Sequence, residues 1–91
     1  MIDVQSAICQ CLESLQPQQI KITDQTHLHS GHAHNTGGGH YELLIVSDVF
    51  TNLSRMARQR KIYQLLKDLF EQRAIHAINI KALTISEYLA L

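Results

Sequence analysis

Histidine is the residue type in this sequence best suited to chemistry, because five of its six histidines fall between positions 27 and 40. Imidazole is a good ligand for zinc, copper, nickel and iron, and a flexible loop can gather several imidazoles around one ion. A polar loop that is merely rich in histidine is the other interpretation, and the spacing leaves both open. No His-Glu-x-x-His motif is present, and no second cluster of cysteines or carboxylates completes a zinc site. The five are His27, His29, His32, His34 and His40.

The sixth histidine, His76, opens a predicted strand over 75–83. By the two-residue alternation of a strand, we expect its side chain on the same side as Ile78, Ile80 and Ala82. A lone histidine in that position is either a hydrogen-bonded edge residue or a ligand. The outcome depends on the end of the sheet at which this strand starts, and the residues alone do not decide it.

Half of the positive charge lies in the first two turns of a predicted helix. Positive charge at a helix N-terminus opposes the helix dipole, so local stability would not select this arrangement. A binding site for an anionic partner is one explanation. A solvated face with ion pairs to Asp48 or Glu42 is the other, and both stay open. The basic residues are Arg55, Arg58, Arg60 and Lys61.

Length and composition predict one domain over residues 1–91 with a modest core, since 45% of the residues are apolar. Eight basic residues balance eight acidic ones, which argues against nonspecific nucleic-acid binding. No apolar run is long enough to span a membrane and the first residues do not form a signal peptide, so we expect a cytoplasmic protein without a membrane partner. Cys9 and Cys11 are too few for a disulfide framework, and we expect both to be reduced.

Hydrophobic spacing predicts an α+β fold with the element order α-β-β-α-α-β. The strand over 40–46 is apolar on both faces, which suits a central position. Strands joined by a helix run parallel, whereas the first two strands pair antiparallel across a long loop. We therefore expect a three-stranded mixed sheet with helices packed on one face. The predicted elements are a first helix ended by Pro17, strands over 20–23, 40–46 and 75–83, a His- and Gly-rich loop over 24–39, a short turn over 49–55, a principal helix over 55–73 and a last helical turn over 85–91.

Five segments, in this order and spacing, resemble the BolA family over roughly residues 3–88. The resemblance implies a fold similar to the type II KH domain, which agrees with the predicted element order. KH domains clamp nucleic acid with a Gly-x-x-Gly loop between two helices. All four glycines here lie before residue 40, so that loop is absent. The segments are Ile22-Thr23-Asp24-Gln25-Thr26, His27-Leu28-His29-Ser30-Gly31-His32, the run from His40 to Phe50 with its Val-Ser-x-x-Phe end, Arg58-Gln59-Arg60-Lys61-Ile62-Tyr63 and Ile75-His76-Ala77-Ile78-Asn79-Ile80.

The sequence departs from the family pattern at Gln25-Thr26, where the family usually has Glu-Ser, and at Asn52 and Gln59. Asn52 stands where the family often has glycine, and the turn can survive because asparagine tolerates a left-handed backbone. Gln59 replaces the middle histidine of an Arg-His-Arg motif, which removes a titratable group and leaves the role of that position open.

The resemblance implies a partner protein of monothiol glutaredoxins that shares a glutathione-assisted, bridging [2Fe–2S] cluster and acts in iron–sulfur and iron handling. Two imidazoles on one iron are chemically sound, as in Rieske centres. The ligand roles fall on His76 and on a loop position that aligns best with His29, with His32 as the alternative. A glutaredoxin cysteine and a glutathione thiolate would hold the other iron. No cofactor is expected in the isolated chain, which would be a monomer or a weak homodimer.

The resemblance also implies a rival function, a DNA-binding transcriptional regulator of stress response and cell morphology. Its structural basis would be a helix–turn–helix-like segment over 51–70 that carries the four basic residues. An enzyme of sulfur chemistry is disfavoured because it needs an activated thiol. Cys11 lies in the apolar stripe of the first helix and Cys9 has no basic neighbour within a turn, so we expect no enzymatic activity.

Overall fold

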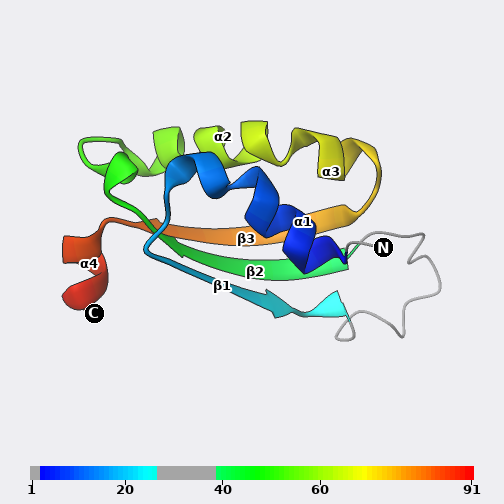
Figure 1. Ribbon diagram of the computed structural model, residues 1–91, viewed down its shortest axis with the longest axis horizontal. Helices are drawn as coiled ribbons and strands as arrows, with labels where there is room; N and C mark the ends of the chain where they lie inside the picture. Colours follow the sequence, from blue (N-terminus) through cyan, green and yellow to red (C-terminus); the bar gives the residue numbers. More distant parts are fainter. Residues whose placement is uncertain (1–2, 27–38) are drawn as a thin grey trace.

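The computed structural model describes residues 3–26 and 39–91, and these form a three-stranded mixed sheet in the order β1-β2-β3. β1 pairs antiparallel with β2, and β2 pairs parallel with β3. Helices α1, α2 and α3 lie over one face of the sheet (Figure 1). The predicted α+β class and strand directions are therefore confirmed. The elements are α1 (Val4–Cys11), η1 (Glu13–Leu15), β1 (Gln19–Asp24), β2 (Gly39–Val46), η3 (Asp48–Phe50), α2 (Arg55–Leu65), α3 (Lys67–Glu71), β3 (Ile75–Leu83) and α4 (Ile85–Leu89).

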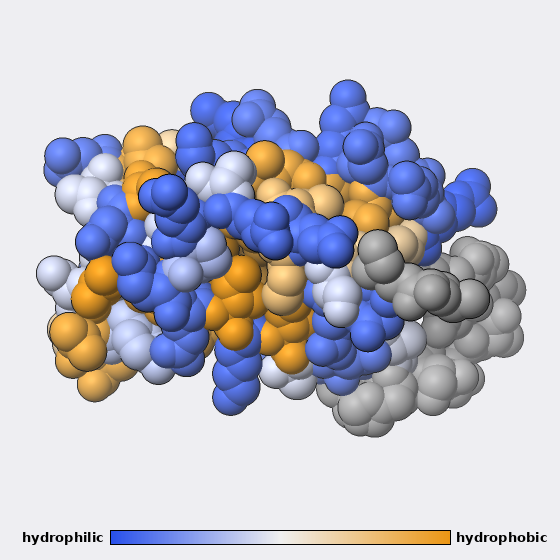
Figure 2. Space-filling model, in the orientation of Figure 1, coloured by the Kyte–Doolittle hydropathy of each residue, from blue (hydrophilic) through white to orange (hydrophobic). Residues whose placement is uncertain are grey.

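The core lies between the sheet and the helices. The central strand β2 contributes Tyr41, Leu43 and Ile45, which alternate along the strand and are buried on its helix-covered face. From α1 and α2 come Ile8 and Ile62, both fully buried. In the space-filling view, hydrophobic residues are visible in the middle of the molecule and polar residues surround them (Figure 2). This packing makes the central strand a fixed platform for the residues at its two ends.

Helix α1 begins where the Asp3 side chain accepts a hydrogen bond from the Ser6 backbone N–H at 2.7 Å, an arrangement that satisfies one free N–H of the first turn. The helix ends at Cys11 and is followed by the turn η1, so it is shorter than the sequence predicts. Gln16 then takes a left-handed conformation with φ of 48°. The chain reverses there and enters β1.

The turn after β2 is held by one buried hydroxyl. Ser47 is 1% exposed, donates a hydrogen bond to the Leu15 carbonyl oxygen at 2.5 Å and accepts one from the Val49 N–H at 3.2 Å. Asn52 follows with φ of 66°. The expectation that asparagine supports a left-handed turn at this position is therefore confirmed.

The principal helix predicted over 55–73 is divided in the structure. Helix α2 ends at Leu65 and α3 begins at Lys67, with the fully buried Leu66 between them at φ −94° and ψ 3°. The Leu69 N–H bonds to the Leu66 carbonyl at 3.0 Å, so the turn is tightened by an i to i+3 bond. The single-helix prediction was wrong here because hydrophobic spacing alone does not show where a turn tightens.

After the sheet, α4 begins with a capping box. The Glu87 N–H donates to the Thr84 hydroxyl at 3.2 Å, and the Thr84 N–H donates to the Glu87 carboxylate at 2.8 Å. Within the part of the chain that the structure describes, no helix is both long and apolar enough to cross a membrane.

Candidate functional site

β3 begins at the end of the sheet where β1 ends and β2 begins (Figure 1), and His76 is the second residue of β3. The first residues of β2 and β3 are neighbours in the parallel ladder, since Gly39 pairs with Ile75 and its N–H donates to the Ala74 carbonyl at 3.1 Å. On the other side, the Gln25 N–H donates to the His40 carbonyl at 2.7 Å. The sequence left open at which end the third strand starts, and the structure shows that it starts at the loop end.

A β-bulge changes the direction of the His76 side chain. The ladder passes from Gly39 paired with Ile75 to His40 paired with Ala77, so His76 is one extra residue in β3. Ile75 and Ile78, three residues apart, are both buried, whereas His76 is exposed. The prediction that His76 shares the side of Ile78 was wrong because the extra residue shifts the alternation by one.

The bulge brings His76 beside a second histidine. The ring centroids of His40 and His76 lie 5.0 Å apart, and the ring planes are tilted by 45°. Sequence reasoning placed His40 at the start of a strand but did not pair it with His76. The available signal was positional, because two histidines at the first residues of adjacent parallel strands lie at the same edge of the sheet.

The backbone of His40 is fixed by its neighbours. Its N–H donates to the Thr26 hydroxyl at 3.1 Å, and its carbonyl accepts from Gln25. On either side of it, Gly39 and Tyr41 face the core and are buried. A Cβ atom at Gly39 would overlap the Tyr41 ring, so glycine is needed there for close packing. His40 therefore points to the opposite, helix-free face of the sheet.

Tyr41, the next residue of β2, is buried on the core side of the sheet. Burial raises the pKa of its phenol, and the charge of Asp24 raises it further, while a hydrogen bond with Thr26 acts in the opposite direction. Tyr41 is therefore a neutral packing group, and the chemistry available at this edge is that of the imidazoles.

The other two predicted ligands, His29 and His32, lie outside the described residues. Within residues 3–26 and 39–91, no group of three or more His, Cys, Asp or Glu side chains is placed to hold a metal ion. The described part of this edge thus offers two imidazoles, and a metal bound there needs further ligands from elsewhere.

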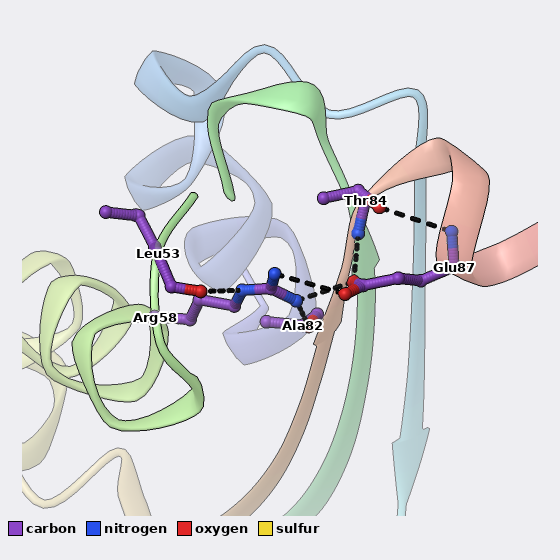
Figure 3. A network of polar contacts seen from close by, with 5 residues as sticks. All are labelled: Leu53, Arg58, Ala82, Thr84 and Glu87. Atoms are coloured by element: carbon purple, nitrogen blue, oxygen red, sulfur yellow. Dashed lines mark hydrogen bonds and ion pairs between the residues drawn. The ribbon is translucent and has the colours of Figure 1, made fainter. Parts of the chain in front are cut away.

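The four basic residues predicted as a binding cluster divide into two kinds. Arg58 is 12% exposed, and its guanidinium donates to the carbonyls of Leu53 at 3.1 Å and Ala82 at 3.0 Å. It also forms a two-point ion pair with Glu87, with distances of 2.6 and 3.2 Å (Figure 3). The alternative interpretation expected a partner at Asp48 or Glu42, and the partner is Glu87. Arg55, Arg60 and Lys61 are exposed.

The ion pair acts strongly on the carboxyl group. Hydrogen bonding to Arg58, followed by the backbone hydrogen bond from Thr84, lowers the pKa of Glu87 from 4.5 to about 2. The ring of Phe50 lies 5.9 Å from the guanidinium carbon, so Arg58 also covers the core. We conclude that Arg58 joins α2, β3 and α4 and is a structural residue.

The segment over 51–70 does not form the helix–turn–helix that the sequence suggested, and all of its residues are described. The element before α2 is the three-residue turn η3, and α3 continues in much the same direction as α2 (Figure 1). A helix–turn–helix needs two helices at a steep angle. Ser47 is the N-cap of η3 and Thr51 is its C-cap, so the element before α2 is three residues long and does not form a first helix.

Side chains from α2 cover the outer edge of β3. The carbonyls of Ile78, Ile80 and Ala82 accept hydrogen bonds from three side chains. This gives Gln59 the role that the sequence left open, because its side-chain amide is a donor to β3. The donors are the Tyr63 hydroxyl at 3.2 Å, the Gln59 amide at 2.9 Å and the Arg58 guanidinium at 3.0 Å.

The cysteines do not form a reactive centre. Cys9 and Cys11 are free thiols, both partly buried on α1. Burial raises the pKa of the Cys11 thiol, and the charge of Asp68 adds to this effect. A raised pKa makes the thiolate scarcer at neutral pH, which is the opposite of what a nucleophilic cysteine needs.

The fold and this edge define a class of small α+β protein with an exposed histidine at the start of a parallel edge strand. The chain matches the family model described as BolA-like protein over residues 12–87. The chain belongs to the BolA family. All five segments that carried the resemblance lie within the matched residues.

Solved structures and curated proteins agree with this assignment. BolA1 from Arabidopsis thaliana superposes with a TM-score of 0.81 at 29% identity, over 96% of this chain and 97% of that chain. The BolA domain of SufE1 from the same plant gives 0.79 at 35% identity, over 96% and 99%. The DNA-binding transcriptional regulator BolA of Haemophilus influenzae is 32% identical over 86% of this chain and 73% of its own length.

The matches cover very different shares of the relatives' own lengths. An uncharacterised protein of Buchnera aphidicola is 43% identical over 54% of this chain, and the match spans 61% of the relative. SufE-like protein 1 of Arabidopsis thaliana is 36% identical over 82% of this chain, and the match spans 22% of that protein. The family is thus found both as a small protein and as one domain of a larger one.

Proposed function

We propose that this protein binds a monothiol glutaredoxin and shares with it a glutathione-assisted, bridging [2Fe–2S] cluster. In this role it acts in iron–sulfur cluster handling and in iron or redox regulation, as a binding protein and not as an enzyme. The observation that carries the proposal is the exposed His76 imidazole, whose ring centroid lies 5.0 Å from that of His40 where β2 and β3 begin, next to a β-bulge.

The donor set at this edge fits one iron of such a cluster. Two imidazoles replace two thiolates on one iron in Rieske-type centres, and this substitution raises the reduction potential of the cluster. The described part of the chain supplies two imidazoles and no third ligand beside them. A bridging arrangement, in which a partner's thiolates hold the second iron, therefore agrees with what the chain offers.

The chain's own residues would act as a fixed template. The β-bulge directs His76, while Thr26 and Gln25 hold the backbone of the neighbouring strand. Arg58, Gln59 and Tyr63 fix β3 along its outer edge. The imidazoles would then be presented to the partner with little reorganisation, which reduces the cost of ordering on binding.

Anaerobic mixing with a glutathione-loaded, cluster-bearing monothiol glutaredoxin tests the proposal. Native mass spectrometry is expected to show a 1:1 heterodimer with two irons and two sulfides, and the visible circular dichroism spectrum should change on mixing. His76→Ala is expected to abolish the change, whereas Asn79→Ala, an exposed substitution on the same strand, should keep it. Absence of a heterodimer, or a His76→Ala spectrum equal to that of the wild type, would overturn the proposal.

A transcriptional role is the second candidate, supported by the similarity to the DNA-binding transcriptional regulator BolA of Haemophilus influenzae and by three exposed basic residues on α2. We propose that Arg55, Arg60 and Lys61 contact phosphates, since Arg58 is engaged within the fold. Replacing the three by glutamine should lower the slope of log K against log salt by about 0.9 per lost contact on duplex DNA. Weak binding that is equal for promoter and unrelated DNA would exclude specific regulation.

A further inference from the structure

We propose that the outer edge of β1 is a docking site for an extended peptide segment of a partner protein, which adds to the sheet as a further strand. The segment that fits this edge alternates apolar residues with acidic ones. β1 forms one edge of the sheet, and β3, which carries His76, forms the other (Figure 1). Peptide binding at β1 is therefore separate from the proposed function and goes beyond it.

The backbone of β1 directs hydrogen-bonding groups away from the sheet at every second residue. The Gln25 N–H donates to the His40 carbonyl on β2 at 2.7 Å. Because an antiparallel ladder alternates, the odd-numbered residues of β1 bond to β2, and Ile20 and Ile22 direct their N–H and C=O groups outward. Within the described part of the chain, no hydrogen bond reaches these outward groups. They are the groups to which an added strand would bond.

The two edges of the sheet differ in how well they are covered. On β3, three carbonyls already accept hydrogen bonds from the side chains of Arg58, Gln59 and Tyr63. The described residues provide no such donors along the outer edge of β1. An uncovered edge strand is a template for pairing with another chain, so an added strand would pair with β1.

A hollow of about 460 Å³ beside β1 can receive side chains of the added strand. Ile20 and Ile22 line it, and both are partly exposed although they pack against the core. Residues directly opposite each other in paired strands have their side chains on the same face, so apolar residues opposite Ile20 and Ile22 would cover them. The other lining residues, from α1 and its N-cap, are Asp3, Gln5, Ser6, Cys9 and Gln10.

The opposite face of β1 determines the charge that the added strand should carry. Lys21 lies on this face, is exposed, and forms no ion pair or side-chain hydrogen bond within the described residues. Opposite charges on directly opposed residues stabilise a strand pair. An acidic residue between the two apolar ones would lie opposite Lys21. The expected recognition pattern is therefore apolar, acidic, apolar.

A second copy of this chain fits the edge less well than such a peptide. Two antiparallel β1 strands related by a two-fold axis place Lys21 opposite an odd-numbered residue of the other copy. These residues are Gln19, Lys21 and Thr23, and none of them is acidic. Asp24 lies on the other face and cannot be opposite Lys21. Lysine on an edge strand is also a common protection against self-pairing, so a different polypeptide is the occupant that the charges favour.

Hydrogen exchange of the isolated chain, measured by NMR with a synthetic peptide, tests the docking site. The probe is the acetylated and amidated peptide Thr-Val-Glu-Val-Glu-Val-Thr at up to about 1 mM. It should slow the exchange of the Ile20 and Ile22 amides and leave those of Lys21 and Thr23 unchanged, because the latter already bond to β2. The same peptide N-methylated on its valines lacks the N–H groups that would meet Ile20 and Ile22, and it should not bind.

A charge exchange tests the recognition pattern. Lys21→Glu should weaken binding of the glutamate peptide at least about threefold and should favour the analogue with lysine in place of glutamate. Lys81→Glu is the matched control, since Lys81 is exposed on the same face of the sheet in β3, and it should leave the affinity for both peptides unchanged.

Three results would overturn the proposal: no binding of the glutamate peptide, equal binding of its N-methylated form, or equal effects of Lys21→Glu and Lys81→Glu. Protection of Ile20 and Ile22 that rises with protein concentration without peptide would show that a second copy is the occupant instead. The experiment contains neither glutaredoxin nor iron, so its failure leaves the proposed function standing, and failure of the proposed function leaves the docking site standing.

Discussion

Replacing Arg58 by methionine removes a guanidinium and keeps the apolar length of the side chain. The change leaves two backbone carbonyls without their donors, those of Leu53 and Ala82. Arg58 is 12% exposed, and a hydrogen bond from a charged donor contributes about 1.5–3 kcal/mol at such sites. The ion pair with Glu87 adds little, because 46% of the Glu87 side chain is exposed and water screens the pair. We expect the free energy of unfolding to fall by about 2–4 kcal/mol.

Urea unfolding followed by circular dichroism measures this loss, with the m-value checked for a change in the denatured state. Glu87→Gln is the matched control, because it removes the charge and retains an acceptor for Arg58 and Thr84. The control is expected to lose less than half of what Arg58→Met loses. If the two variants lose equal stability, the ion pair and not the anchoring of the carbonyls is the main effect. A loss below about 1 kcal/mol for Arg58→Met would show that water replaces the guanidinium at little cost.

Three further predictions concern Glu87, Gly39 and Tyr63. The pKa of Glu87 is lowered from 4.5 to about 2. Its contribution to stability is therefore complete above about pH 4.5 and is lost as the pH falls toward about 2. In Glu87→Gln, the urea midpoint should depend less on pH over that range than in the wild type. Gly39→Ala forces its Cβ into the Tyr41 ring and should destabilise by about 1–3 kcal/mol in thermal unfolding, and relief by Tyr41→Leu in the double variant would confirm the cause. Tyr63→Phe removes the donor to Ile78 and should cost about 0.5–1 kcal/mol in urea; no loss would show that water satisfies that carbonyl.

Periodicity was enough to predict the architecture. The doubly apolar run around Leu43 predicts a central strand, and the helix between the second and third strands requires that they run parallel if they are neighbours. If the second and third strands are neighbours, these two facts place the start of the third strand, and with it His76, at the end of the sheet where the second strand begins. The adjacency itself depends on tertiary packing, so the sequence left this choice open.

The details of the site depend on single-residue features that hydrophobic periodicity and charge spacing do not reveal. The bulge at His76 adds a single residue, and a rule of strict alternation has no means of detecting it. The partner of Arg58 is Glu87, 29 positions further along the chain, so charge spacing within the helix could not identify it. The family resemblance assigns the ligand roles to His76 and to a loop position, His29 or His32, and these roles stay predictions.

The bonds from α2 to β3 also affect how copies of this protein meet. An exposed edge strand offers its carbonyls as a template on which a strand of another molecule can be added, a common route to aggregation. In β3, the carbonyls of Ile78, Ile80 and Ala82 already accept hydrogen bonds from within the chain. Intermolecular strand addition beside His76 would first have to displace these three donors. The strand that presents the imidazole is thereby protected from self-association through its backbone, and it stays accessible to a partner that recognises its side chains.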